Sequence, residues 1–113
     1  GCGGDRDPVK RPAMGQIGVE MADYAIITSD NPRTEEPMAI IRDILKGIDP
    51  AKKNYEIIEN RPAAIRHAMD IAKKNDIIVL AGKGHETYQQ IHAARHHLDE
   101  REVVAAHLEE TRE

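Results

Sequence analysis

Short apolar runs alternate along this chain with stretches in which apolar residues recur every three or four positions. The runs are typical of buried strands, and the spaced pattern is typical of helices with one apolar face. Strands are predicted at residues 24–28, 55–58 and 77–81, the last from the run "DIIVLAG". Helices are predicted at residues 12–22, 37–47, 61–75 and 99–109. Their expected inward-facing residues are Met14, Ile17 and Met21; Ile40, Ile41, Ile44 and Leu45; Ile65, Met69 and Ala72; and Val103, Val104 and Leu108.

Strands separated by helices predict an α/β fold in three layers, Rossmann-like, with a mostly parallel sheet. In such sheets ligands bind beyond the carboxyl ends of the strands. Two polar loops follow predicted strands and are expected at that edge: "SDNPR" from Ser29 and "GKGHE" from Gly82. A third loop, "GCGGDRD" at residues 1–7, would join them if a strand preceded it.

Length and charge narrow the class of protein. The 113 residues predict one domain, residues 1–113, and the net charge of −4, with both signs mixed along the chain, gives no reason to expect nucleic acid as a partner. No apolar run approaches the roughly 20 residues of a membrane span, and no signal peptide is visible. The single cysteine, Cys2, is compatible with a reducing compartment. We therefore expect a cytoplasmic protein without a membrane partner.

The polar loops carry the chemistry of a binding site. Arg6 and Arg33 lie in two of them, and paired guanidiniums can clamp an anionic group. Either arginine alone would be read as a solvated surface charge. Together with Asp30, Asn31 and Glu86 they suit a zwitterion, with carboxylates on the arginines and ammonium on the acids.

Other motifs carry little weight. "AGKGHE" lacks the Ser or Thr of a phosphate-binding loop, so it is read as a glycine turn that allows close approach. "GCGG" has Arg6 where a dinucleotide fingerprint needs its third glycine. His92 and His96 are four residues apart, but no third ligand supports a zinc site, and no base can be assigned to activate Cys2. No metal site and no catalytic residue are predicted in this chain.

The motifs "GCGGDRD…KRPxMG", "SDNPRTEEP" and "AGKGHETYQ" together resemble the C-terminal domain of the Mur ligases over residues 1 to about 108. The resemblance implies that "DNPR" recognises meso-diaminopimelate, with Arg33 reading its extra carboxylate. It also implies that the first strand of the domain is missing, and that "HHLDERE" departs locally from the family pattern. The implied contacts of meso-diaminopimelate are Arg6, Asp30, Asn31, Pro32, Arg33, Gly82 and Glu86.

The family reaction implied by this resemblance is ATP-dependent amide formation through an acyl phosphate. ATP and magnesium would be bound mainly by a central domain, and the UDP-MurNAc-dipeptide by domains other than this one. We then expect a monomeric ligase in bacterial peptidoglycan synthesis, of which this chain binds the amino acid but is inactive alone. The alternatives are a stand-alone amino-acid-binding module, which an upstream ATPase domain in the reading frame would argue against, and a nucleotide-binding Rossmann domain, which thermal protection by NAD or ATP would indicate.

Overall fold

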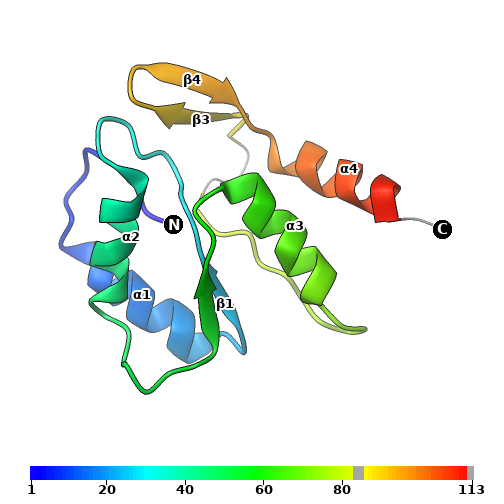
Figure 1. Ribbon diagram of the computed structural model, residues 1–113, viewed down its shortest axis with the longest axis horizontal. Helices are drawn as coiled ribbons and strands as arrows, with labels where there is room; N and C mark the ends of the chain where they lie inside the picture. The colour runs from blue at the N-terminus through cyan, green and yellow to red at the C-terminus, as the bar shows by residue number, and fades with distance from the viewer. Residues whose placement is uncertain (83–85, 112–113) are drawn as a thin grey trace.

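The computed structural model describes residues 1–82 and 86–111 of the chain. Within these residues, four helices and four strands follow one another along the chain, arranged as in Figure 1. Their order is α1 (Lys10–Met21), β1 (Ala25–Ile27), α2 (Pro37–Leu45), β2 (Tyr55–Ile57), α3 (Arg61–Ile71), β3 (Tyr88–Ile91), β4 (Ala94–His97) and α4 (Glu100–Thr111).

The strands β1 and β2 form a parallel pair, with Ala25 opposite Tyr55 and Ile27 opposite Ile57. The connection between them contains α2, as parallel pairing requires. In Figure 1, α1 and α2 lie on one side of this pair, and α3 with α4 lies on the other. The predicted α/β class with parallel pairing and helices on both sides is confirmed.

The main core lies between the sheet and the helices α1 and α2. It consists of aliphatic side chains that are at most 8% exposed: Val19, Ile27, Ile40, Ile41, Ile44 and Ile48. The predicted inner residues Ile40, Ile41 and Ile44 of α2 are confirmed. The helix begins with Pro37 in its first turn, where the missing N–H costs nothing.

The predicted inner face of α1 is wrong. Met14, Ile17 and Met21 are 49%, 54% and 83% exposed, and the buried positions are Arg11, Gly15 and Val19. The reason is the close approach of α1 to α2, since a Cβ on Gly15 would lie 2.2 Å from the carbonyl oxygen of Ile44. The contact therefore selects the face that carries the glycine.

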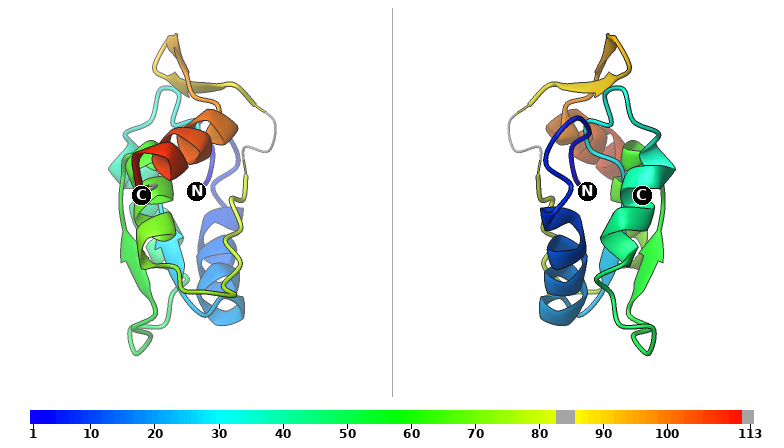
Figure 2. Two further views of the ribbon diagram at one scale, coloured as in Figure 1. Left: turned by 90° about the vertical axis from the view of Figure 1, so that its right-hand side faces the viewer. Right: turned by 90° about the vertical axis from the view of Figure 1, so that its left-hand side faces the viewer.

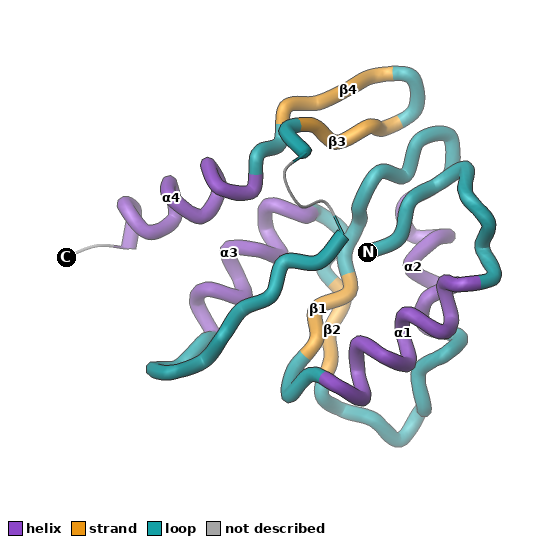
Figure 3. The backbone as a smooth tube through the Cα atoms, turned by 180° about the vertical axis from the view of Figure 1, so that it is seen from behind, coloured by secondary structure: helices purple, strands orange, loops and turns teal. Residues whose placement is uncertain are grey.

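The predicted strand at residues 77–81 is also not a strand in the structure, and Figure 3 draws it as loop. Ile77 and Val79 are 88% and 77% exposed. Figure 2 shows this segment on the side of β1 that faces away from β2. The N-terminus lies between the segment and β1. A segment becomes a strand of a sheet only when its backbone is hydrogen-bonded to a neighbouring strand. No described strand is paired with residues 77–81, so they remain a loop.

The second half of the chain also differs from the prediction. Helix α3 ends at Ile71 rather than Asn75, because a turn follows in which Asn75 has a φ of 75° and the Lys73 N–H donates to Asp76 (2.7 Å).

The weakly patterned residues after Thr87 form an antiparallel hairpin, β3–β4, in which Tyr88 pairs with His97. In α4, Leu108 is 57% exposed, so its predicted inward orientation is wrong; the buried residues of this helix are Glu100 and His107.

Candidate functional site: a rim of three loops

The three polar loops meet at the carboxyl end of β1. A Cβ on Gly1 would lie 2.6 Å from the carbonyl oxygen of Thr28. A Cβ on Gly82 would lie 3.7 Å from Oδ2 of Asp30 and 3.8 Å from the carbonyl oxygen of Gly1. The expected common edge is thus formed by the described residues, while Lys83, Gly84 and His85 of the glycine turn lie outside them.

The "GCGGD" loop packs directly on the "DNPR" turn. The Gly4 N–H donates to the carbonyl of Asn31 (2.7 Å), and a Cβ on Gly4 would overlap the carbonyl oxygen of Pro32 at 1.8 Å. Gly4 is buried, so glycine is required here for close backbone contact. The two loops therefore form one unit.

Arg6 and Arg33 are brought together around Gly3. A Cβ built on Gly3 would lie 2.8 Å from Nη1 of Arg33 and 3.6 Å from Cγ of Arg6. Nη1 of Arg33 donates to the carbonyl of Gly4 (2.9 Å). A guanidinium has five N–H donors, so Nε and Nη2 of Arg33 carry three more that suit a carboxylate.

The strand β3 supports the "DNPR" turn from its other side. The Arg33 N–H donates to the carbonyl of Gln90 (3.0 Å), and the Gln90 N–H donates to Oδ1 of Asn31 (2.9 Å). Asn31 is 3% exposed, and Pro32 is among the fully buried side chains. These two side chains shape the turn. Direct ligand contact by them stays a prediction, as it does for Arg6, Asp30, Arg33, Gly82 and Glu86.

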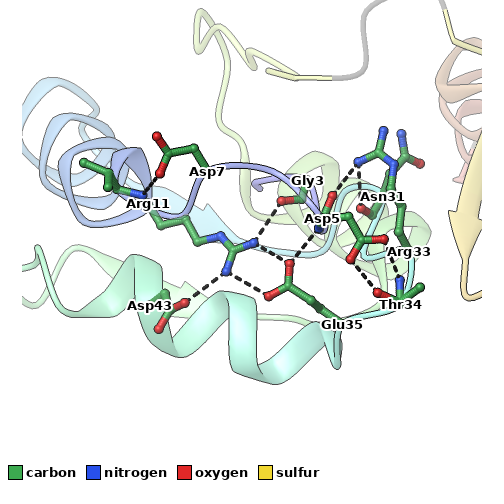
Figure 4. A network of polar contacts seen from close by, with 11 residues as sticks. Gly3, Asp5, Asp7, Arg11, Asn31, Arg33, Thr34, Glu35 and Asp43 are labelled. Carbon is green, nitrogen blue, oxygen red and sulfur yellow. Dashed lines mark hydrogen bonds and ion pairs between the residues drawn. The ribbon is translucent and has the colours of Figure 1, made fainter.

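A buried arginine that the sequence analysis did not single out joins the same loops (Figure 4). Arg11 is 3% exposed and donates to both carboxylate oxygens of Glu35, at 3.2 and 2.8 Å, and to Asp43 at 3.0 Å. The hydrogen bond with Glu35 raises the pKa of the Arg11 guanidinium, and the same bond is the main cause of the lowered pKa of Glu35. The arginine in the quoted motif "KRP" was the available signal for this network.

A second buried arginine, also missed, connects the ends of β1 and the 76–82 segment. Arg61 donates to Glu100 (2.7 Å), to the carbonyl of Ser29 (3.2 Å) and to the carbonyl of Ala81 (3.0 Å). Ser29 and Ala81 directly precede Asp30 and Gly82, two predicted site residues. Arg61 thus places two of the three loops relative to each other.

Among the described residues of the rim, Cys2 is a poor nucleophile. Burial raises the pKa of the Cys2 thiol, which disfavours its reactive thiolate. Among residues 1–82 and 86–111, no group of three His, Cys, Asp or Glu side chains could hold a metal ion. No helix in this part of the chain has the length and apolar character to cross a membrane. The described residues of the rim include the guanidiniums of Arg6 and Arg33 and the carboxylate of Asp30.

These features define an α/β domain with a candidate binding site at the carboxyl end of a parallel strand pair. The family described as "Mur ligase, glutamate ligase domain" matches residues 1–84. The chain belongs to this family.

Several curated relatives carry the name UDP-N-acetylmuramoyl-L-alanyl-D-glutamate–2,6-diaminopimelate ligase. The Clostridioides difficile (strain 630) protein is 59% identical over 104 residues, which cover 92% of this chain and 22% of that protein. The Clostridium tetani relative is 60% identical over 110 residues, 97% of this chain and 22% of its own length. The Bacillus cereus relative is 55% identical over 104 residues, 92% of this chain and 21% of its own length.

A solved structure of a ligase with the same name superimposes with a TM-score of 0.94 at 43% identity. The superposition covers 100% of this chain and 23% of that one. This chain therefore spans less than a quarter of the length of the relatives it matches.

Proposed function

We propose that this chain is the amino-acid-binding domain of a ligase that adds meso-diaminopimelate to UDP-N-acetylmuramoyl-L-alanyl-D-glutamate in peptidoglycan synthesis. The observation that carries the proposal is the placement of Arg6 and Arg33 around Gly3, with Asp30 beside Gly82. Two cations at Gly3 and a carboxylate at Gly82, on loops that meet at one edge, are the groups that a ligand with carboxylates and an ammonium requires. The relatives are named as 2,6-diaminopimelate ligases, which supports the same choice of ligand.

The role of this chain in the reaction is to bind and orient the amino acid. One of its amino groups must be presented to the activated carboxyl of the D-glutamyl residue, where it forms the amide as phosphate leaves. Arg33 holds the carboxylate at the far end of the side chain, and Asp30 and Glu86 hold the remaining ammonium. Such positioning accounts for a large part of a bimolecular barrier. ATP and magnesium belong to other domains of the same cytoplasmic, monomeric ligase.

The proposal is tested with the full-length protein that contains this chain. Given ATP, magnesium and the UDP-MurNAc-dipeptide, it is expected to release phosphate and form a UDP-tripeptide with meso-diaminopimelate, and much less with L-lysine. Calorimetry with the two amino acids should show the same preference. Residues 1–113 alone are expected to release no phosphate above background. Equal use of L-lysine would contradict the assigned substrate, and phosphate release by residues 1–113 alone would contradict the assigned division of labour.

We further propose that residues 1–113 form one domain whose sheet is completed by a parallel strand running into Gly1, between β1 and the 76–82 segment. Apolar side chains that this strand would cover are exposed on both flanks: Ile17, Met21, Ile77 and Val79. The sulfur of Cys2 lies 3.5 Å from that of Met14, so a strand continuing upstream would run along this face of α1.

The completed sheet gives a measurable expectation. A longer chain that includes the residues encoded directly before Gly1 should unfold at a higher temperature than residues 1–113. The amides of residues 77–80 should become protected from hydrogen exchange, because they would gain backbone partners. Unchanged exchange at these amides in the longer chain would refute the added strand.

A further inference from the structure

The side chain of Arg11 contacts the loop at residues 1–7, the residues that follow the "DNPR" turn, and helix α2. Its Nη2 donates to the carbonyl of Gly3 (3.1 Å) and to Glu35 (2.8 Å), and its Nη1 donates to Asp43 on α2 (3.0 Å). We propose that Arg11 is a positioning residue that sets the relative placement of Arg6 and Arg33, and thereby the affinity for the amino acid. This inference rests on the proposed function.

The contacts continue from Arg11 into both loops. Oε2 of Glu35 also accepts from the N–H of Asp5 (2.7 Å). The carboxylate of Asp5 in turn accepts from the N–H of Thr34 at 3.3 Å and from its hydroxyl at 2.5 Å. Asp5 directly precedes Arg6, and Thr34 directly follows Arg33. The network therefore ends one residue from each proposed ligand-binding arginine (Figure 4).

The backbone at these points needs such support. Asp5 and Arg33 have φ values of 54° and 55°, in the left-handed region that residues other than glycine seldom adopt. Such conformations persist where the surroundings determine them, and they occur often at binding sites. The Asp5 N–H donates to Glu35 and the Thr34 N–H donates to Asp5. These hydrogen bonds hold the backbone of the two loops next to Arg6 and Arg33.

Arg11 acts through other residues and not by touching the ligand. Its side chain is 4% exposed, and four hydrogen bonds engage both of its Nη atoms. A buried ion pair is weak evidence for stability, because its attraction offsets the desolvation of two charges only in part. Fixing the geometry of the two loops is the role that its contacts support.

The test compares variants of the full-length ligase. Arg11→Met is expected to raise the KM for meso-diaminopimelate about 10- to 100-fold, because a displaced Arg33 would lose its charge-assisted hydrogen bonds to the ligand carboxylate. The kcat and the KM for ATP should change little. Arg11→Lys should recover part of the loss, because an ammonium cannot reproduce the planar fork. Glu35→Gln keeps the shape and one acceptor oxygen, and should raise the same KM to a smaller extent.

A double variant separates positioning from a general structural role. If Arg11 acts through Arg33, Arg11→Met should add little to the KM of an Arg33→Ala enzyme, because the two changes remove one shared function. Lys46→Ala is the matched control: Lys46 is also paired with Asp43, at 3.1 Å, but its side chain is 69% exposed. It should leave the KM values unchanged.

Two results would overturn the inference: full additivity of Arg11→Met and Arg33→Ala, or a lowered unfolding temperature with an unchanged KM for the amino acid. Failure of the proposed function is seen separately, in the wild-type enzyme. If the wild type uses another amino acid, the KM for that amino acid tests Arg11 by the same comparison.

Discussion

Arg33→Ala in the full-length ligase is expected to lower kcat/KM for meso-diaminopimelate by about one to two powers of ten, while kcat/KM for L-lysine changes little. The two amino acids differ by one carboxylate at the end of the side chain. A hydrogen bond to a charged group contributes about 1.5–3 kcal/mol, which corresponds to this loss. Lysine presents an ammonium there and loses no such contact.

The structure adds one complication to this experiment. Arg33 also donates to the carbonyl of Gly4, so alanine removes a contact between two loops as well as a ligand contact. Arg33→Lys should recover only part of the activity, since it keeps the charge without the fork. Arg66→Ala, an exposed arginine on α3, is the matched control and should behave as wild type. Equal losses for both amino acids would mean that Arg33 is structural, and Arg6 would then be the better candidate for discrimination.

The sequence predicted the buried face of a helix correctly where the apolar pattern coincides with the face that packs against the rest of the protein. Helix α2 carries isoleucines at helical spacing, and the structure buries that same face. In α1 the apolar spacing indicated Met14, Ile17 and Met21, but the contact with α2 is made through Gly15. A glycine contributes nothing to an apolar pattern, so helix packing of this kind cannot be read from hydrophobicity.

The candidate site was predictable as three loops but not as a network. Polar residues after an apolar run indicated where Asp30 and Arg33 would lie, and Arg6 was expected beside them on the condition that a strand preceded its loop. Arg11 and Arg61 were overlooked because Arg11 directly precedes a predicted helix and Arg61 begins one, and a charged residue at such a position is usually solvated. The carboxylates that accept from them, on Glu35, Asp43 and Glu100, are 24 to 39 residues away, and no local spacing indicates such pairs. The hairpin β3–β4, which supports the "DNPR" turn, was likewise hidden in a weak pattern.

Glu100→Ala is expected to have the largest effect on stability. The side chains of Arg61 and Glu100 are 3% and 6% exposed, and their charged groups are 2.7 Å apart. Removing the carboxylate leaves a buried guanidinium without its counter-charge, which costs about 3–5 kcal/mol. A domain of this size is stabilised by about 5–15 kcal/mol in total. Urea unfolding of residues 1–113 should therefore show a strongly reduced free energy of unfolding.

The neighbouring residue supplies the control for this measurement. Arg101 is also paired with an acid, Asp99, at 2.9 Å, but its side chain is 76% exposed, and Arg101→Ala should change the free energy of unfolding little. A double replacement of Arg61 and Glu100 by apolar residues should not restore full stability. The carbonyls of Ser29 and Ala81 would lose the donors that Arg61 provides, and a buried carbonyl without a donor is costly. An equal loss for Glu100→Ala and Arg101→Ala would contradict this prediction. The attraction between Arg61 and Glu100 would then be offset entirely by the desolvation of the two charges. Only the two carbonyl contacts of Arg61 would join β1 to the 76–82 segment.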